Sequence, residues 1–532
     1  MKECRTVAPG SVRRLVIAAL LPLALLVLCL PSAALARVVP TDKGPVRGIE
    51  TAAGTQYLGI PYAAPPVGAL RWQPPQPAAR WHGPLGATQF ANHCPQPASP
   101  FGFASTTEDC LYLNVFTPNK ARDKDKLHKH IPVMVWLHGG GLLVGESDDY
   151  DPSRLVGQGV IVVTINYRLG FLGFLTHPAL TAESGTSGNY GLMDQQAALR
   201  WVKRNIAKFG GDPGNVTIFG ESAGGLSVHS QLSSPLAAGL FERAIVESGA
   251  YSLSQPSLSQ AEARGTDLAG MVGCADQTAA CLRNVSVQTL LADQPQTPGA
   301  IGPNVDDKVL TQSVSAAFES GQFNRVPVIE GSNHDEFSIF AALNIEFVFG
   351  QLPPSFYPVV LSVLVPTIAP NTTPAAVMAE YPISNYPSLG VAVTAIGTDA
   401  LFACPGRRAA RAISKFAPTY AYEFNDRNAP QVFLPPASFP YGAYHASELA
   451  YLFDSSLRGG HAPLNPDQEA LAATMVRYWT QFARSGTPNG PATPNWPGYT
   501  VSNDTYQSLV PPTPEPETGF SADHHCAFWD PL

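Results

Sequence analysis

The sequence predicts an α/β fold built on a mostly parallel sheet, because strand-like and helix-like segments alternate along the chain. Continuous apolar runs at 132–138 and 160–167 are typical of strands buried on both faces of such a sheet. A helix-like segment, 194–213, lies between these runs and the next one. Its apolar side chains recur at helical spacing, at Ala198, Val202, Ile206 and Phe209, and Gly210 and Gly211 end the pattern.

Three further segments repeat the strand-then-loop pattern, at 216–220, at 243–249 and from Val326 onward. Near the end of the chain Asn465 can cap a helix that Pro466 opens. One apolar face of that helix consists of Leu471, Met475, Tyr478 and Phe482.

Other tracts fit this alternation poorly. Residues 44–72 are rich in turn formers and aromatic residues, and we expect them to wrap the surface. The tracts 331–403 and 428–444 are rich in proline and weakly periodic, which favours insertions that form the walls of a site. We find no internal repeat and no linker, so the sequence favours one domain, residues 37–532.

The N-terminal residues have the pattern of an export signal. Basic residues precede the apolar run 15–30, and Ala34-Leu35-Ala36 offers a small-residue cleavage site. We expect residues 1–36 to be a signal peptide and the mature chain to be secreted or otherwise extracytoplasmic. A retained membrane anchor is the alternative, although the run is short for a span. No later stretch reads as apolar enough to cross a bilayer.

Charge and cysteine usage narrow the function classes. The formal net charge is −8 with no basic run, which argues against nucleic acid as a partner. Of the 8 cysteines, Cys4 and Cys29 fall in the expected signal peptide. The remaining even set suits disulfides in an exported chain, but spacing does not select one pairing, and no spacing resembles a zinc site. These residues are Cys94, Cys110, Cys274, Cys281, Cys404 and Cys526.

Ser222 is the candidate nucleophile, in the pentapeptide Gly220-Glu221-Ser222-Ala223-Gly224 directly after the predicted strand 216–220. A serine on a sharp strand-to-helix turn needs glycines two residues away on either side, because side chains there would collide. An ordinary tight surface turn is the alternative.

A glycine-rich sequence, His138–Gly141, follows the predicted strand that ends at Leu137. Backbone without Cβ atoms can approach a substrate and turn its N–H groups inward. We therefore predict an oxyanion hole from the amides of Gly140, Gly141 and Ala223. A flexible turn and a phosphate-binding loop are the alternatives, but the latter would want a nearby lysine, and none follows.

Ordered signatures along the chain resemble those of type B carboxylesterases, α/β hydrolases that include cholinesterases, bile-salt-activated lipase and bacterial para-nitrobenzyl esterases. The resemblance runs from about Gly44 to the last residues. It rests on the glycine-rich sequence above and on "YLGIPYAAPPVGALRW", "EDCLYLNVFTP", "NYRLGFLGFL", "GNYGLMDQQAALRWVKRNIAKFGGDPGNVTIFGESAGG" and "GSNHDEFSIF". It implies an α/β-hydrolase fold, a mostly parallel central sheet flanked by helices, with large insertions around the active site.

The resemblance also supplies partners for Ser222. The family's acid corresponds to Glu336 in "GSNHDE", and its base corresponds to His445 in "YHASELAYLF". The order serine, glutamate, histidine is that of α/β hydrolases. The neighbouring Asp335 is the alternative acid. The glycine that usually follows the acid is Phe337 here, which puts the packing of that loop in doubt.

Polar residues are also expected around the base, at Glu221, Ser248 and Glu448, without a catalytic role. The resemblance implies the disulfides Cys94–Cys110, Cys274–Cys281 and Cys404–Cys526, the last as the remaining pair.

The expected function is that of a serine carboxylic-ester hydrolase that needs no metal or organic cofactor and acts on a small-molecule ester. The loop 95–109 contains Phe101 and Phe103 but no tryptophan to hold a choline group, and Leu142 and Leu143 follow the glycines. We therefore expect uncharged esters with short or medium acyl chains. A lipase of the same family and a non-catalytic esterase-like binding protein are the alternatives. The oligomeric state stays open.

Overall fold

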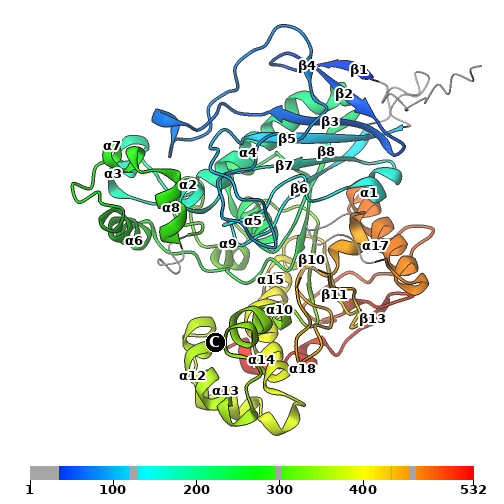
Figure 1. Cartoon of the computed structure of the whole chain (residues 1–532). Coiled ribbons are helices and arrows are strands. Elements are labelled where there is room, and N and C mark those ends of the chain that lie inside the picture. Colours follow the sequence, from blue (N-terminus) through cyan, green and yellow to red (C-terminus); the bar gives the residue numbers. More distant parts are fainter. Residues whose placement is uncertain (1–34, 120–129, 295–300, 433, 455–462, 532) are drawn as a thin grey trace, which may run out of the picture.

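The computed structural model describes residues 35–119, 130–294, 301–432, 434–454 and 463–531. Within these residues one large sheet runs through the molecule (Figure 1). Its strands are β1 (Leu35–Pro40), β2 (Pro45–Glu50), β3 (Gly54–Pro61), β4 (Leu85–Gly86), β5 (Tyr112–Pro118), β6 (Ile131–Leu137), β7 (Ile161–Ile165), β8 (Gly211–Glu221), β9 (Arg243–Glu247), β10 (Val328–Asn333), β11 (Thr419–Phe424), β12 (Tyr506–Leu509) and β13 (Glu515–Glu517).

The strand order is β1-β2-β3-β5-β7-β6-β8-β9-β10-β11-β12-β13, with β4 paired to β2. Pairing is parallel from β7 through β12 and antiparallel at both ends of the sheet. The parallel strands therefore present their carboxyl ends along one side, where α/β folds place their ligands.

Helices flank this sheet on both faces, and a further group of helices packs in a cluster of its own. They are α1 (Ser153–Gly157), α2 (Gly170–Phe174), α3 (Pro178–Ser184), α4 (Tyr190–Asn205), α5 (Ala223–Ser233), α6 (Leu258–Met271), α7 (Ala279–Asn284), α8 (Val287–Asp293), α9 (Val314–Ser320), α10 (Ser338–Ala341), α11 (Phe347–Phe349), α12 (Tyr357–Ile368), α13 (Pro374–Glu380), α14 (Leu389–Thr398), α15 (Cys404–Ile413), α16 (Leu449–Leu452), α17 (Pro466–Ser485), α18 (Phe520–Asp523) and α19 (Cys526–Trp529).

Strand β6 shows how the sequence divides the core. Val133, Val135 and Leu137 pack in a cluster with α4 and α5 on one face. Met134 and Trp136 point to the other face and pack with α17. Successive strand residues face opposite ways, so an unbroken apolar run serves both cores.

The predicted strands at 132–138, 160–167, 216–220, 243–249 and from 326 are confirmed as β6 to β10. Helix α4 and the 3₁₀ turn Ile206–Phe209 that follows it match the expected helix, which ends at Gly210 in the left-handed conformation (φ 94°). The predicted cap of α17 is also confirmed, because the Asn465 side chain accepts hydrogen bonds from the N–H groups of Asp467 and Gln468.

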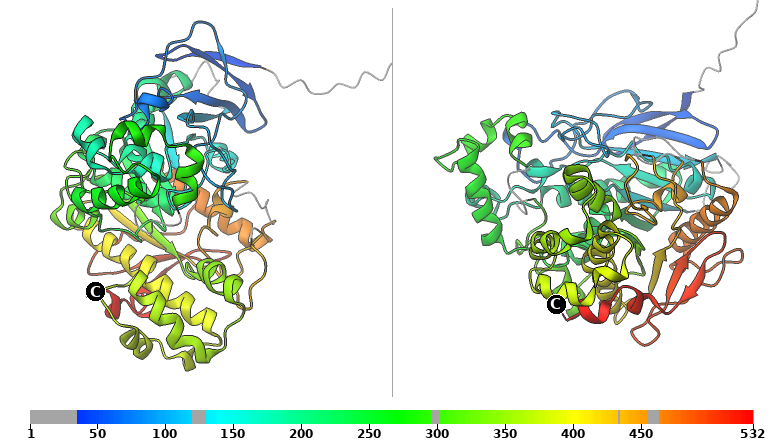
Figure 2. Two further views of the ribbon diagram at one scale, coloured as in Figure 1. Left: turned by 60° about the vertical axis from the view of Figure 1, so that its left-hand side comes forward. Right: turned by 60° about the horizontal axis from the view of Figure 1, so that its bottom comes forward.

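The expectation that residues 44–72 wrap the surface is wrong, and the tract 331–403 contains helices that its weak periodicity did not reveal. Residues 44–72 include β2 and β3, which pair antiparallel near one end of the sheet. The glycines and prolines of this tract hide the two strands in the sequence. The tract 331–403 is mainly helical, and its helices α10 to α14 share a separate apolar cluster. Figure 2 shows these yellow-green helices gathered at the end of the molecule away from the blue N-terminal strands.

The structure contains the three disulfides that the resemblance implied, Cys94–Cys110, Cys274–Cys281 and Cys404–Cys526. The last joins α15 to α19 across 122 residues of sequence. The C-terminus accordingly lies beside α14 and α15 in Figures 1 and 2.

The expected signal peptide falls mostly on residues 1–34, which lie outside the described residues. Among those that are described, the helical stretch Leu389–Ile413 is long and apolar enough to cross a membrane by length and composition, so the expectation that no later stretch is apolar enough is wrong. However, 72% of its apolar window is buried inside the molecule, as in the core helix of a soluble protein.

Candidate active site

Ser222 sits at the turn between β8 and α5 with φ 56° and ψ −120°, a conformation that costs a non-glycine residue energy. The turn is held because the Ser222 N–H donates to Glu247 O (2.8 Å) on the neighbouring strand β9. The strained serine at a strand-to-helix corner is the geometry expected of a nucleophile elbow.

The flanking glycines are required by close backbone contacts. A Cβ on Gly224 would lie 1.9 Å from Leu137 O, and one on Gly220 would lie 2.6 Å from the same oxygen. Leu137 ends β6 and pairs with Gly220. The glycines therefore let the turn pack directly against the end of β6, where the glycine-rich loop begins.

The loop Gly139–Gly141 borders the same cavity as Ser222. Gly140 and Gly141 have positive φ values of 100° and 66°. His138 anchors the loop, because its ring stacks on Tyr167 (4.4 Å between centroids) and its carbonyl accepts a hydrogen bond from the Tyr167 hydroxyl (2.6 Å). Burial lowers the pKa of His138 to about 4, so its neutral ring serves packing rather than charge.

His445 and Glu336 are in contact. Glu336 Oε2 lies 2.6 Å from His445 Nδ1, and Glu336 Oε1 accepts a hydrogen bond from the Asn333 N–H (2.8 Å). Both side chains are buried. A carboxylate on Nδ1 fixes the ring orientation and leaves Nε2 to exchange a proton.

Asp335, the alternative acid, points elsewhere. Its carboxylate binds the Arg427 guanidinium (Nε to Oδ2, 2.5 Å) and accepts the Ala443 N–H (2.9 Å). The geometry therefore brings Glu336, and not its neighbour, to the histidine.

The other ring nitrogen of His445 lies near Glu221, with Nε2 to Oε1 at 3.2 Å. No hydrogen bond joins Ser222 Oγ to His445 Nε2 among the described residues. Such contacts are often long in a free enzyme and tighten when substrate binds. The serine, the histidine and Glu221 all line the same cavity.

Buried carboxylates surround this histidine. Burial, partly offset by His445, raises the pKa of Glu221 to about 7. Burial by itself would lower the pKa of His445, but the charges of Glu221 and Glu336 raise it above its ordinary value. Glu448 accepts a hydrogen bond from the Asn333 amide (2.5 Å). The site is thus arranged to stabilise an imidazolium ion.

The cavity over Ser222 has a volume of about 600 Å³ and mainly apolar walls. The first proline-rich tract contributes to these walls, as expected, whereas the second tract, 428–444, supplies none of the described lining residues, contrary to expectation. The apolar walls comprise Pro97, Phe101, Leu143, Val144, Tyr150, Tyr251, Leu291, Phe337, Ile339, Phe340, Leu401, Phe402 and Ala446.

Sequence reasoning missed several neighbours of the site. Glu247 is the last residue of β9, yet it is buried, accepts the Trp479 N–H (2.7 Å) and holds the Ser222 turn through its carbonyl. Tyr251 lines the cavity close to Ser222. The only available signal was that a charged residue, Glu247, ends an otherwise apolar strand.

Two groups of described side chains could hold a metal ion, His334 with Glu423 and His524, and His93 with Glu146 and Asp148. Neither group lines the cavity over Ser222.

Comparison with known proteins places these features in a family. The family described as "Carboxylesterase family" matches residues 35–529. The chain is 36% identical to cocaine esterase of Oryctolagus cuniculus over 504 residues, covering 89% of this chain and 92% of that protein. It is 35% identical to para-nitrobenzyl esterase of Bacillus subtilis (89% and 94% covered) and 34% identical to liver carboxylesterase of Sus scrofa (83% of each). With its α/β-hydrolase fold, the chain belongs to the carboxylesterase family and is a carboxylic ester hydrolase.

Proposed function

We propose that the protein is a secreted serine esterase that cleaves uncharged esters with short or medium acyl chains through an acyl-enzyme. The observation that carries the mechanism is the buried pair of His445 and Glu336, 2.6 Å apart, at the cavity that also contains the strained Ser222.

In this mechanism His445 removes the proton of Ser222, which attacks the ester carbonyl. Glu336 orients the ring, and together with Glu221 it stabilises the positive charge that forms. The amides of Gly140, Gly141 and Ala223 receive the oxyanion, each worth about 3 kcal/mol by analogy with other enzymes. His445 then protonates the departing alcohol and activates the water that releases the acid.

The walls of the cavity support the proposed substrate class. They are apolar, contain no tryptophan among the described lining residues, and hold one carboxylate, Glu221. Burial raises the pKa of that carboxyl to about 7, so it offers a weaker counter-charge than an exposed glutamate. The names of the relatives, cocaine esterase and para-nitrobenzyl esterase, agree with esters of small organic molecules.

The assignment is tested with nitrophenyl esters of increasing acyl length and a set of matched variants. Ser222→Ala and His445→Ala should retain no more than a few per cent of kcat/KM while their circular dichroism is unchanged. Glu336→Gln should lose about four orders of magnitude, whereas Asp335→Asn should stay within tenfold of wild type. A Glu336→Gln enzyme as active as Asp335→Asn would contradict the assigned acid.

A lipase activity is the second candidate, and one observation favours it. The helical stretch that begins with the cavity residues Ile339 and Phe340 continues into exposed apolar side chains, among them Val348 (62% exposed) and Phe349 (68%). On α12, Val363 is 71% exposed. A patch of this kind beside a site suits contact with a lipid surface.

A comparison of the rates on emulsified triglyceride and on a soluble ester separates the two functions. An esterase shows no rise in rate when the substrate exceeds its solubility limit, whereas a lipase does. The double variant Val348→Ser/Phe349→Ser should leave hydrolysis of soluble esters unchanged in either case, and should abolish the rise only if the patch contacts lipid.

Secretion follows from residues 1–36 as a cleaved signal peptide, and the three disulfides support an oxidising compartment. Cleavage after Ala36 would remove the first two residues of β1 and leave Arg37–Pro40 to pair with β2. N-terminal sequencing of protein recovered from the culture medium tests this, and an intact N-terminus in the membrane fraction would indicate an anchor instead.

A further inference from the structure

A second cluster of titratable side chains lies outside the catalytic cavity, near the C-terminus. Glu423 is on β11, His524 follows α18, and His334 follows β10. One ligand atom from each of these three residues lies within 4.8 Å of the others. Chain segments far apart in sequence thus bring two imidazoles and a carboxylate together, at a place where the proposed esterase mechanism uses none of them.

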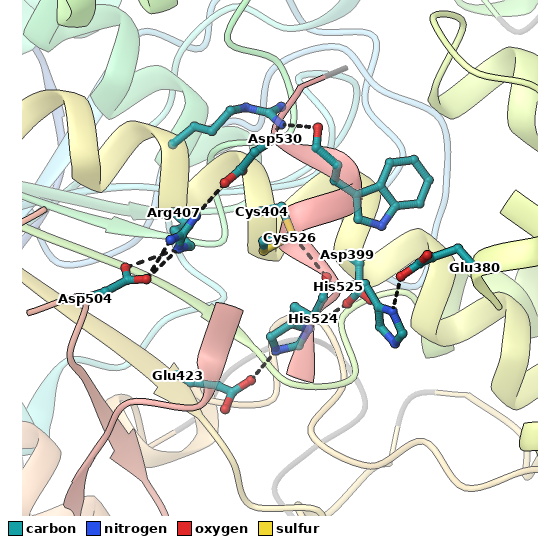
Figure 3. The surroundings of a disulfide bond; sticks show 12 residues. Glu380, Asp399, Cys404, Arg407, Glu423, Asp504, His524, His525, Cys526 and Asp530 are labelled. Atoms are coloured by element: carbon teal, nitrogen blue, oxygen red, sulfur yellow. Dashed lines mark hydrogen bonds and ion pairs between the residues drawn. A yellow bond between two sulfur atoms is a disulfide. The ribbon is translucent and has the colours of Figure 1, made fainter. Parts of the chain in front are cut away.

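The ring of His524 is held by two carboxylates (Figure 3). Its Nδ1 lies 2.6 Å from Asp399 Oδ1, and its Nε2 lies 2.6 Å from Glu423 Oε1. The three side chains are 2–3% exposed. In metal sites a ligating histidine usually binds a carboxylate through its other nitrogen, which fixes the ring. Asp399 occupies that orienting position and leaves Nε2 directed toward Glu423.

Glu517, on the edge strand β13 close by, lies outside this group, because the ligand atoms within 4.8 Å of one another come from His334, Glu423 and His524.

The balance of charge around the cluster is negative. Asp335, Asp399, Glu423 and Asp523 contact the two histidines, and Arg427, which binds Asp335, reaches His334 Nε2 (3.3 Å) from a side chain that is 53% exposed. The side chains of His334 (19%) and Asp523 (61%) open the cluster to solvent, so an ion can enter.

We propose that His334, Glu423 and His524 form a binding site for a divalent transition-metal ion of the Zn²⁺ class, separate from the active site. Two imidazoles and one carboxylate, completed by a water molecule, are a ligand set that Zn²⁺ accepts with tetrahedral geometry, whereas Mg²⁺ and Ca²⁺ prefer oxygen ligands alone. Binding displaces the protons that now join Glu423 to His524 and Asp523 to His334. The bound ion links the turn after β10, strand β11 and the segment that leads to the Cys404–Cys526 disulfide, so we expect it to raise the stability of the fold.

The test uses the full-length protein, stripped with a chelator and dialysed. Titration with Zn²⁺ should show one saturable site by calorimetry and a rise in Tm, and Co²⁺ should give the visible absorption of a tetrahedral site. Glu423→Gln and His334→Gln should each weaken Zn²⁺ affinity at least tenfold and abolish the Co²⁺ spectrum. Neither residue lines the cavity over Ser222, so hydrolysis of a soluble ester should continue unchanged in each variant and shows that the variant is folded.

His93→Gln is the matched control, because His93 belongs to the other cluster, with Asp148 Oδ2 3.0 Å from its Nε2. This variant should bind Zn²⁺ as wild type does. The proposal is overturned if no saturable binding occurs, if Glu423→Gln and His334→Gln bind Zn²⁺ normally, or if only His93→Gln weakens binding. Tighter binding of Mg²⁺ than of Zn²⁺ would also overturn it.

Discussion

Replacing Gly224 by alanine tests how closely the serine turn must pack on strand β6. A Cβ at this position would lie 1.9 Å from Leu137 O and 2.8 Å from Leu137 C, both backbone atoms that cannot rotate away. Restoring an ordinary contact of 3.4 Å requires the turn and the strand to separate by about 1.5 Å. Because Leu137 leads into the glycine-rich loop, this separation moves the proposed oxyanion donors away from Ser222.

Misplacing reacting groups by about 1 Å costs on the order of 100-fold in rate, and overpacking costs about 1–3 kcal/mol of stability. We therefore expect Gly224→Ala to lose at least 100-fold in kcat/KM on nitrophenyl acetate and to unfold at lower urea concentration. The matched control is Gly406→Ala in α15, where the new Cβ meets nothing closer than Glu330 Oε1 at 3.8 Å.

The control should keep full activity and gain up to about 1 kcal/mol, since alanine favours a helix more than glycine does. If Gly224→Ala kept more than a third of wild-type activity and its urea midpoint, the argument from close packing would be refuted. If both variants failed alike, the effect would be one of helix substitution in general and not of this contact.

Three other predictions follow from the structure. Replacing both Cys404 and Cys526 by alanine frees a loop of 122 residues, and the free energy of unfolding measured with urea should fall by up to about 5 kcal/mol. Cys404 found unpaired in a non-reducing peptide map would contradict the disulfide itself. Burial raises the pKa of Glu221 from 4.5 to about 7, so the folded state holds this proton more tightly than the unfolded chain does. The free energy of unfolding of the wild type should therefore fall as the pH rises from 4.5 to 7. Glu221→Gln should show a smaller fall over this pH range. The kcat/KM for acetylthiocholine should be less than tenfold above that for an uncharged thioacetate of similar size. The first disulfide loop offers the choline cation the ring of Phe101 and no tryptophan, and phenylalanine binds a cation more weakly.

The central strands could be predicted because residues buried on two faces leave an unmistakable apolar run. β2 and β3 could not, because they are only partly buried, in patterns that are neither a continuous apolar run nor a strict alternation, and glycines interrupt both strands. The helices of 338–403 were hidden for another reason. They pack against one another in their own cluster, so their apolar residues do not form a single stripe.

The candidate site also has parts that the sequence predicts and parts that it does not. The Ser222 turn carries its own local requirement for small residues, and the clash distances at Gly220 and Gly224 explain it. Choosing Glu336 over Asp335 needed the family resemblance, since adjacent carboxylates differ only in the direction that the turn after β10 gives them. The contact between His445 Nε2 and Glu221 joins residues more than 200 positions apart, and no local pattern encodes it.

The helices between β10 and β11 have a consequence for engineering. Leu401 and Phe402 reach the cavity from this inserted segment, while Ser222 and the glycine-rich loop stand at the ends of strands outside it. Glu336 belongs to the turn that directly follows β10, and Asp399 and Cys404 fix the far end of the segment to the C-terminal residues. A donor segment grafted between these two anchors would therefore exchange one wall of the cavity, and with it the shape of ester that fits, on an unchanged catalytic platform.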